Sequence, residues 1–297
     1  MPELPEVECV RRTLAPNLAG AHVISVALLR KDILIGAQTV VWGGSLEKQL
    51  LKSDKINALA RHGKNLFFEG LSGRVLCVHL GMTGQLLLLR GPMKTPVDPH
   101  IHCVWQVDGP QGRFVLCFRD PRRFGGLRLL ASREAMQERI DHCMGPDALT
   151  LDEDDLASSL KKTKRSIKAT LLDQTVVAGI GNIYADEALF TARIHPSTPS
   201  CQLNSTRVRR LAESIRVTLQ AALDSGGSTI SDYRNPLNQS GQFQHHHQVY
   251  GRSGEPCERC ARSLKKIIIA QRTTVFCSRC QRVPRARKTS ISNNKPL

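Results

Sequence analysis

The spacing of apolar residues along the chain changes twice, and each change indicates a different kind of element. Near the start, four apolar residues recur at helical intervals and predict an amphipathic helix over 3–18: Val7, Val10, Leu14 and Leu18. From residue 22 to residue 130, short apolar runs are separated by Gly, Pro and Asp, which is typical of a β-sandwich or barrel. We expect strands at 22–29, 65–71, 74–80, 85–90, 102–107, 113–118 and 125–130, with a surface loop at 93–100.

Helical spacing returns after residue 131, and a domain boundary is placed near residues 131–150. Segments suited to helices span 132–143, 152–162, 166–174, 182–194 and 205–223. The stretch 226–256 is rich in Gly, Ser, Asn and Gln and predicts a long loop, either functional or disordered. After Cys280 no apolar periodicity remains, so we expect a flexible tail.

The charge balance indicates a polyanionic partner. Lys and Arg number 42 against 26 Asp and Glu, which gives a formal net charge of +16. Binding to nucleic acid explains so large a positive charge better than a need for solubility alone. From Tyr250 onwards, twelve basic residues face two acidic ones. No apolar run approaches the roughly 20 residues that cross a bilayer, and the acidic start of the chain is unlike a secretory signal. We therefore expect a soluble intracellular protein.

Four of the ten cysteines form two C-x-x-C pairs, Cys257 with Cys260 and Cys277 with Cys280. This spacing predicts a tetrahedral four-thiolate zinc site on a β-hairpin. Because four thiolates leave no open coordination position, we expect one structural ion. The other six cysteines are scattered singly and are interpreted as reduced structural thiols. A run of histidines at 245–247 has no carboxylate or cysteine at ligand spacing and is interpreted as an exposed loop.

The first residues have the composition of a site for covalent chemistry. If Met1 is removed, Pro2 becomes a terminal secondary amine with a pKa of about 8. A secondary amine that attacks an aldehyde-like carbon gives a cationic iminium, which is an electron sink for elimination. Glu3 and Glu6 lie within one helical turn and could donate or relay protons. Many helices begin in this way, so these residues alone favour an ordinary helix start.

Longer motifs occur in a fixed order: MPELPEVE, ARHGKN, HLGMTG, DPRRFGG, GIGNIYADE, GGST, QVYGRSGEPC and the four-cysteine ribbon with QRTTVFC. On these motifs the sequence, from residue 1 to about Cys280, closely resembles the bacterial formamidopyrimidine-DNA glycosylases. The resemblance implies an α+β fold with an N-terminal β-sandwich and a leading helix, then a helix–two-turns–helix domain and a C-terminal zinc finger. It implies a catalytic domain at 1–131, a DNA-binding domain at 132–240, a zinc finger at 241–281 and a basic flexible tail at 282–297.

The resemblance also implies an activity in base-excision repair. The enzyme would be a DNA glycosylase and DNA-(apurinic or apyrimidinic site) lyase that removes oxidised purines, chiefly 8-oxoguanine and formamidopyrimidines. Pro2 matches the nucleophile that forms a Schiff base at C1′, which β- and δ-elimination then resolve. Glu3 matches the general acid that assists sugar-ring opening, and Glu6 matches a helper in proton transfer. Lys64 matches a lysine near the lesion phosphate, although a lysine with a strongly lowered pKa could rival Pro2 as the Schiff-base former.

Other positions match the DNA-contacting residues of that family. A flipped-out nucleotide leaves a gap in the duplex, which the family fills with Met, Arg and Phe, here Met82, Arg122 and Phe124. Asn182 matches a phosphate-binding residue, and the glycines at 179 and 181 before it would let backbone N–H groups approach an anion. Arg272 matches the zinc-finger arginine that binds the phosphate beside the lesion. Further candidates for DNA contact are Tyr250, His79 and His102.

Two segments depart from the family pattern. The loop over the flipped base, at 228–250, carries a proline and the histidine run, so the preference among lesions stays open. The basic extension after Cys280 predicts added non-specific affinity for DNA.

Two other functions remain as alternatives. An endonuclease VIII-like enzyme would act on oxidised pyrimidines, but Leu4 and the complete Met–Arg–Phe set favour the purine enzyme. A non-catalytic DNA-binding protein would explain the charge and the zinc site, but not the conjunction of Pro2, Glu3, Lys64 and Asn182. We expect a monomer that acts on damaged double-stranded DNA in the cytoplasm, associated with the nucleoid.

Overall fold

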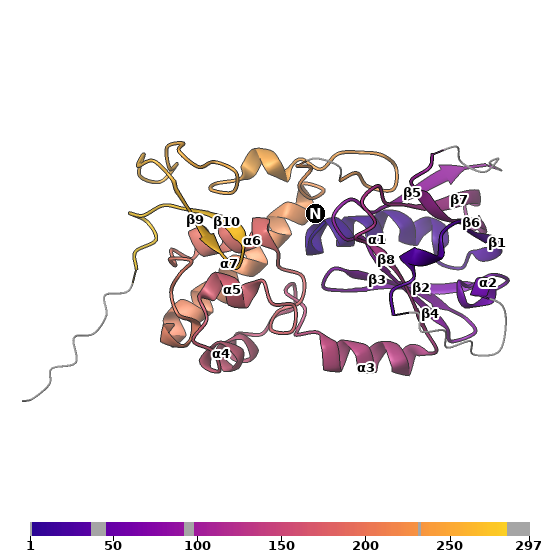
Figure 1. Cartoon of the computed structure of the whole chain (residues 1–297), viewed down its shortest axis with the longest axis horizontal. Coiled ribbons are helices and arrows are strands. Elements are labelled where there is room, and N and C mark those ends of the chain that lie inside the picture. Colours follow the sequence, from indigo (N-terminus) through magenta and orange to yellow (C-terminus); the bar gives the residue numbers. More distant parts are fainter. Residues whose placement is uncertain (1, 37–45, 92–97, 231–232, 284–297) are drawn as a thin grey trace, which may run out of the picture.

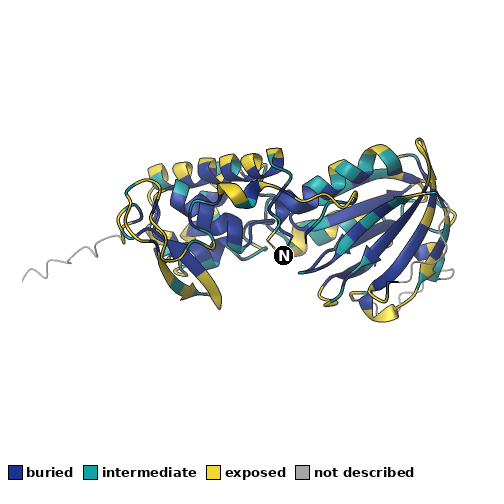
Figure 2. Cartoon of the chain, turned by 90° about the horizontal axis from the view of Figure 1, so that it is seen from above, coloured by how far each residue is buried: buried dark blue, intermediate teal, exposed yellow. Residues whose placement is uncertain are grey.

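The computed structural model describes residues 2–36, 46–91, 98–230 and 233–283. These residues form two lobes, and the start of the chain lies at their junction (Figures 1 and 2). The leading helix α1 (Leu4–Leu18) begins where the backbone N–H of Glu3 donates to the carboxylate of Glu6, at 2.8 Å. The helix predicted for this segment is confirmed.

The first lobe is a sandwich of two antiparallel four-stranded sheets. One sheet has the order β1 (His22–Leu28), β6 (Ile101–Gly109), β7 (Gly112–Arg119) and β5 (Gln85–Arg90). The other has the order β2 (Ile56–His62), β3 (Asn65–Gly70), β4 (Val75–His79) and β8 (Gly126–Leu130). Side chains from both sheets share one core with the buried face of α1, so the predicted sandwich with a leading helix is confirmed.

All seven strands expected in this lobe are present, but the sequence analysis missed β2. Its buried apolar residues, Ile56 and Leu59, are three positions apart because a register shift lies between Ile56 and Ala58. This bulge removes the two-residue alternation by which a strand is recognised. Two short helices were also missed, η1 (Lys31–Ile33) and α2 (Leu46–Gln49).

Helices make up most of the second lobe, and all five were expected: α3 (Arg133–Cys143), α4 (Glu153–Lys161), α5 (Ile167–Leu171), α6 (Asn182–Thr191) and α7 (Ser205–Asp224). Side-chain oxygens cap four of them at Ser132, Asp152, Ser166 and Asn204. Helix α3 connects the lobes and packs Met136 and Ile140 against the outer face of the sheet that contains β3 and β4. The other four helices share a second core, which also includes Leu4 of α1.

The C-terminal part is a hairpin of β9 (Lys265–Ile269) and β10 (Arg272–Phe276), as predicted for a zinc finger. It packs against the end of the helical lobe through Phe190 and Val249. The remaining elements among the described residues are the short helices η2 (Ser200–Gln202) and η3 (Phe243–His246). Most of the expected tail at 282–297 and most of the expected loop at 93–100 lie outside the described residues, because the description ends at 283 and omits 92–97. Among the described residues, no helix is both long and apolar enough to cross a membrane.

Candidate active site and nucleic-acid interface

The first turn of α1 meets the N-terminus of α6 at the junction of the lobes. The Glu3 carboxylate accepts hydrogen bonds from the backbone amides of Gly181, at 2.7 Å, and Ile183, at 3.0 Å. Glu3 is only 2% exposed, and it lies at the positive end of α6, where a carboxylate is stabilised. Pro2, the preceding residue, is buried at the same junction.

Two glycines allow Glu3 to approach α6 so closely. A Cβ atom on Gly181 would collide with the Glu3 carboxylate, and one on Gly179 would collide with the side chain of Leu4. Gly179 also has a φ of +111°, which favours glycine. The sequence analysis assigned these glycines to an anion at a helix N-terminus, and in the structure the anion at that terminus is the chain's own Glu3.

Glu6 is held by three donors in the same buried space. Its carboxylate accepts hydrogen bonds from the Tyr184 hydroxyl at 2.5 Å, the Ser228 amide at 2.7 Å and the Glu3 amide at 2.8 Å. Burial, reinforced by the nearby charge of Glu3, nevertheless raises the pKa of Glu6 above its ordinary value. Glu6 therefore holds a proton more readily than an exposed glutamate. The sequence analysis missed Tyr184 and Ser228, because neither is recognisable without the fold.

Lys64 lies in the two-residue turn of the hairpin β2–β3, after Gly63, whose φ is +55°. The lysine is 7% exposed, and burial lowers its pKa, while the charges of Glu3 and Glu6 act in the opposite direction. The turn therefore brings the ammonium group close enough to feel both carboxylates. A larger fraction of Lys64 is uncharged than for a surface lysine.

The turn that carries Lys64 is anchored to the other lobe through Asp147. This carboxylate accepts from the Gly63 amide at 2.7 Å and pairs with Arg61 at 2.5 Å. Arg61 also pairs with Glu8 of α1, at 3.1 Å. These contacts fix the position of Lys64 relative to the first turn of α1, which is the condition for joint action on one substrate.

The two histidines expected to contact DNA, His79 and His102, lie in different environments. His79 ends β4, and burial together with the charge of Lys64 lowers its pKa. His102 is 3% exposed, and its Nε2 is hydrogen-bonded to the backbone carbonyl of Asp120 at 2.8 Å. His102 thus supports a loop from inside the fold, and its expected contact with DNA stays a prediction. His100, two residues earlier, is exposed and was not singled out.

The expected Met–Arg–Phe set lies on two neighbouring loops of the sandwich, after β4 and after β7. Phe124 is 56% exposed, and the guanidinium of the exposed Arg122 stacks over its ring at 4.9 Å. Met82, on the other loop, is half-buried. An exposed apolar ring beside a guanidinium is the combination that can enter a base stack.

Asp120 joins the two loops below these side chains. It is fully buried and accepts hydrogen bonds from the Thr83 hydroxyl, at 2.5 Å, and the Gly125 amide, at 2.7 Å. The loop backbones are so close that a Cβ on Gly81 would collide with Gly125. The exposed side chains therefore stand on a rigid support, and the sequence analysis missed the residue that makes it.

Asn182, Arg272 and Tyr250 meet where α6 begins and β10 begins. The Asn182 side-chain amide donates to the backbone carbonyl of Thr273 at 3.1 Å, and Asn182 lies close enough to Tyr250 to act on its pKa. Arg272 is exposed, and its charge acts on the pKa of both Lys64 and Tyr250. Cationic and amide groups from three parts of the chain thus surround the carboxylate site.

A buried ion pair fastens the hairpin to the helical lobe at this point. Lys168 of α5 is fully buried and pairs with Asp186 of α6 at 2.7 Å. Its ammonium also donates to the Thr273 carbonyl at 3.2 Å, while Asp186 accepts from the Val275 amide at 3.0 Å. Burial raises the pKa of Asp186 to about 6. The sequence reads as two ordinary amphipathic helices here and gives no signal for the pair.

The third residue of the histidine run is not exposed, which corrects that expectation. His245 and His246 face solvent, but His247 is 7% exposed and its Nε2 is hydrogen-bonded to the Ser228 hydroxyl at 3.1 Å. Burial lowers the pKa of His247 to about 4, so it is neutral near pH 7. Because the Ser228 amide binds Glu6, the histidine run is connected to the carboxylate site through one residue.

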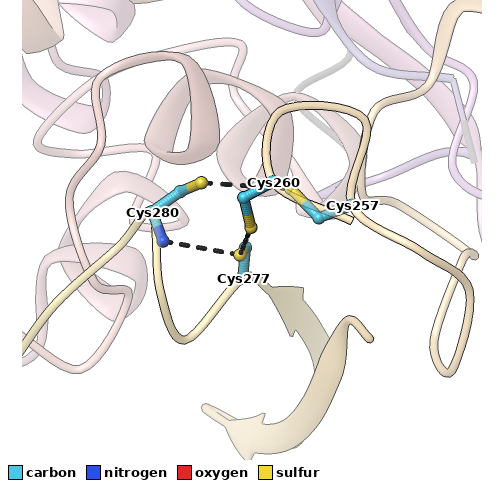
Figure 3. Close-up of side chains that lie close together, drawn as sticks. All are labelled: Cys257, Cys260, Cys277 and Cys280. Carbon is cyan, nitrogen blue, oxygen red and sulfur yellow. Dashed lines mark hydrogen bonds between the residues drawn. The ribbon is translucent and has the colours of Figure 1, made fainter. Parts of the chain in front are cut away.

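The four cysteines of the two C-x-x-C pairs converge, and all four Sγ atoms lie within 4.8 Å of one another (Figure 3). The Sγ atoms are 3.5 Å apart for Cys260 and Cys277 and 4.0 Å apart for Cys257 and Cys280. Tetrahedral zinc with Zn–S bonds of about 2.3 Å requires sulfurs about 3.8 Å apart. The four thiolates therefore fit a zinc ion.

Comparison with known proteins agrees with this geometry along most of the chain. Residues 1–127 match the formamidopyrimidine-DNA glycosylase N-terminal domain, 144–234 its H2TH domain, and 254–283 the zinc finger found in FPG and IleRS. The formamidopyrimidine-DNA glycosylase of Thermomicrobium roseum is 43% identical over an alignment that covers 95% of this chain and 99% of that protein. The chain belongs to the formamidopyrimidine-DNA glycosylase family. It is a DNA glycosylase of base-excision repair, with the AP lyase activity general to that family.

Other members of the family extend the comparison. The formamidopyrimidine-DNA glycosylase of Bacillus subtilis is 39% identical over 285 residues, with 95% of this chain and 99% of that protein covered. A Lactococcus lactis FPG mutant in complex with a Fapy-dG containing DNA has a TM-score of 0.82 and 35% identity, covering 95% of this chain and all of that one. The MutM (FPG) protein of Thermus thermophilus has a TM-score of 0.80 and 36% identity, with the same coverage.

Proposed function

We propose that the enzyme excises oxidised purines, 8-oxoguanine and formamidopyrimidines, from damaged duplex DNA and then cleaves the strand at the abasic site. The observation that carries the proposal is the junction of α1 and α6, where Pro2 is buried beside two carboxylates of different environment. The complex of the Lactococcus lactis relative with Fapy-dG DNA supports a purine-derived lesion as the substrate.

In the proposed reaction, Met1 is removed and the free Pro2 nitrogen attacks C1′ of the flipped-out nucleotide. The N–C bond forms as the glycosidic bond breaks, and the base leaves with the bonding electron pair and takes up a proton. Opening of the sugar ring gives an iminium at C1′. β-Elimination then breaks the bond to the 3′ phosphate, δ-elimination breaks the bond to the 5′ phosphate, and hydrolysis releases Pro2.

The two carboxylates are proposed to divide the proton transfers. Glu3, next to Pro2, takes the proton that the Pro2 nitrogen loses on attack and passes it to the sugar-ring oxygen as the ring opens. Glu6, whose pKa is raised by burial, holds a proton more readily and is hydrogen-bonded to Tyr184 and to the Glu3 backbone. Two neighbouring acids in different environments are a common arrangement for acid–base chemistry.

Lys64 is proposed to bind the phosphate of the flipped nucleotide. Its position near both carboxylates and its lowered pKa also keep it as the alternative amine for Schiff-base formation. Direct identification of the trapped residue separates these roles.

The remaining residues are proposed to hold the DNA. Met82, Arg122 and Phe124 fill the gap left by the flipped nucleotide, and the guanidinium reads the opposite base. Phosphates beside the lesion are bound by Asn182 and Arg272, with Tyr250 and His79 at the edge of the same site. We further propose one structural zinc ion on the four cysteines, action as a monomer, and the domain limits stated from the sequence, 1–131, 132–240 and 241–281.

Borohydride trapping tests the proposal on two duplexes, one with 8-oxoguanine opposite cytosine and one with an oxidised pyrimidine. We expect a stable covalent complex mainly on the first, with peptide mapping placing the adduct on Pro2. An adduct on Lys64 would transfer the nucleophile, and trapping mainly on the second duplex would indicate endonuclease VIII-like specificity. Intact mass measured beforehand verifies that Met1 is absent, because a retained Met1 blocks the amine.

A further inference from the structure

A second cationic site lies at the base of the zinc finger, away from the carboxylates. An open cavity of about 840 Å³ is bounded by the helical lobe and by Cys260 and Cys280. We call it the arginine cavity, because five of its eight lining residues are arginines: Arg193, Arg207, Arg259, Arg279 and Arg282. No acidic residue lines it.

Most of these guanidiniums have no protein partner. Arg259 is used in packing, since it donates to the Phe190 carbonyl at 2.9 Å and stacks on the Phe190 ring at 4.2 Å. Within the part of the chain that the structure describes, the other four guanidiniums form no hydrogen bond or ion pair. Burial and the charge of the neighbouring Arg210 lower the pKa of Arg207, as expected where cations are crowded.

Nearby groups balance only part of this charge. Zinc bound by four thiolates carries two negative charges, fewer than the five positive charges around it. Arg193 follows the C-terminus of α6, where the helix dipole favours a cation. The remaining positive charges repel one another, and an anion bound from outside the protein would reduce this repulsion.

The arginine cavity is separate from the proposed phosphate contacts around the carboxylates. Asn182 begins α6 and Arg193 follows its end, and a helix of 10 residues is about 15 Å long. In the hairpin, Arg272 begins β10, whereas Cys277 and Arg279 follow its end. The two cationic sites therefore lie at opposite ends of α6 and of β10.

We propose that the arginine cavity binds the phosphodiester backbone of a second nucleic-acid segment while the lesion occupies the carboxylate site. An extended polyanion fits better than a small one because the cations continue beyond the cavity. Arg209 and Arg210 are exposed on α7, close in sequence to the cavity residue Arg207. Duplex DNA, with about one charge per 1.7 Å, offers successive phosphates to both groups of arginines. The site keeps the enzyme on DNA between lesions and does not depend on the excision chemistry.

The test uses the zinc-loaded full chain saturated with an unlabelled duplex that carries an abasic-site analogue. A labelled undamaged duplex is then titrated by fluorescence anisotropy, and sedimentation counts the duplexes per protein. The cavity variant is Arg207→Gln/Arg279→Gln/Arg282→Gln, and the matched control is Lys48→Gln/Lys55→Gln/Arg113→Gln on the exposed surface of the sandwich. The zinc content of each variant shows whether the zinc finger is still folded. The single variant Arg207→Gln, which is remote from the cysteines in sequence, tests DNA binding without a change beside a zinc ligand.

We expect the wild type to bind two duplexes, and the cavity variant to bind the second at least tenfold more weakly. Its salt dependence should fall by roughly 2.7 in log–log slope, about 0.9 for each lost contact. Absence of a second duplex on the wild type, or equal losses in both triple variants, overturns the proposal. Tripolyphosphate binding without duplex binding assigns the cavity to a soluble polyphosphate and also overturns it. Excision is measured in parallel, and its failure with second-duplex binding intact contradicts only the proposed function.

Discussion

The carboxylate site at the α1–α6 junction and the two loops that carry Met82, Arg122 and Phe124 are built on opposite principles. At the junction the side chains proposed to transfer protons are buried and hydrogen-bonded: Glu3 and Glu6 each accept more than one hydrogen bond. On the loops the buried partner is Asp120, and the side chains proposed to act have no fixed place in the core.

The difference follows from the task proposed for each region. Proton transfer needs groups whose position and protonation are set before the substrate arrives, and burial with several donors achieves both. Insertion into a base stack needs side chains that the protein has not already covered, on a backbone that resists displacement. Mutations at the junction should therefore lower the rate of excision and leave DNA affinity nearly unchanged. On the loops, a mutation of the buried Asp120 should lower stability, whereas a mutation of an exposed side chain should lower excision.

The largest effect is expected from Glu3→Gln. Loss of the charge and of the transferable proton should lower single-turnover excision of 8-oxoguanine by at least about 100-fold. Affinity for a duplex with an abasic-site analogue should stay within a few-fold of wild type, because Glu3 faces α6 rather than the proposed phosphate contacts. Glu213→Gln, at an exposed residue of α7, serves as the control. Full excision by the Glu3 variant would contradict the assigned role.

Asp120→Asn should cause the next largest effect, this time on stability. The asparagine keeps only one of the two carboxylate oxygens, because an NH₂ group that cannot accept replaces the other, so it cannot accept from both Thr83 and Gly125. One of these buried hydrogen bonds is lost, and the free energy of unfolding falls by about 2 kcal/mol. Chemical denaturation measures the change, with the exposed Asp108→Asn as the control, expected to remain within about 0.5 kcal/mol. A variant as stable as wild type would show that the loops do not need this support.

Phe124→Ala should have the opposite effect to Asp120→Asn, with excision reduced and stability unchanged. The ring is 56% exposed, so stability should change by no more than about 0.5 kcal/mol. Excision from duplex DNA should fall about tenfold, equivalent to about 1.4 kcal/mol of lost insertion energy. Leu71→Ala, at a residue 67% exposed on a different turn of the sandwich, controls for loss of exposed apolar area. Equal excision by the two variants would remove Phe124 from the insertion set.

The smallest effect is the pH dependence of stability at the junction. Because burial raises the pKa of Glu6 above 4.5, its contribution is fully present below about pH 4.5 and is lost as pH rises through the folded-state value. Glu8, whose pKa is lowered to about 2, contributes above pH 4.5 and loses that contribution as pH falls towards 2. Melting temperatures of Glu6→Gln and Glu8→Gln against wild type should therefore diverge in opposite directions with pH. Parallel curves would place Glu6 in an ordinary environment.

The sequence was sufficient for elements whose pattern is local. Helix α1, seven strands of the sandwich and the cysteine hairpin each carry their own periodicity or spacing. Strand β2 was missed because its bulge changes the interval between Ile56 and Leu59. The family motifs indicated the candidate site residues, because the motifs occur in a recognisable order along the chain.

The supporting residues were not predictable in the same way. Asp120 stands inside the motif that supplied Arg122 and Phe124, yet only the fold shows that its carboxylate binds the other loop. The family pattern suggested a DNA contact for His102, and the polar loop suggested exposure for His247. Both are buried, because burial is decided by contacts distant in sequence, such as that of His247 with Ser228. A local pattern identifies what a side chain is and leaves open what covers it.

Helix α1 is divided between the two cores, and this has a consequence for how the chain is made. Leu4 packs in the helical lobe and its amide binds the Gly179 carbonyl at 3.1 Å, whereas Val7 and Val10 belong to the sandwich. During synthesis the first residues leave the ribosome long before residue 179 exists. The sandwich can collapse around most of α1, but its first turn must wait for the other lobe. Contacts so far apart in sequence form slowly, so the first turn of α1, which carries the proposed catalytic residues, should be among the last parts to reach its final place.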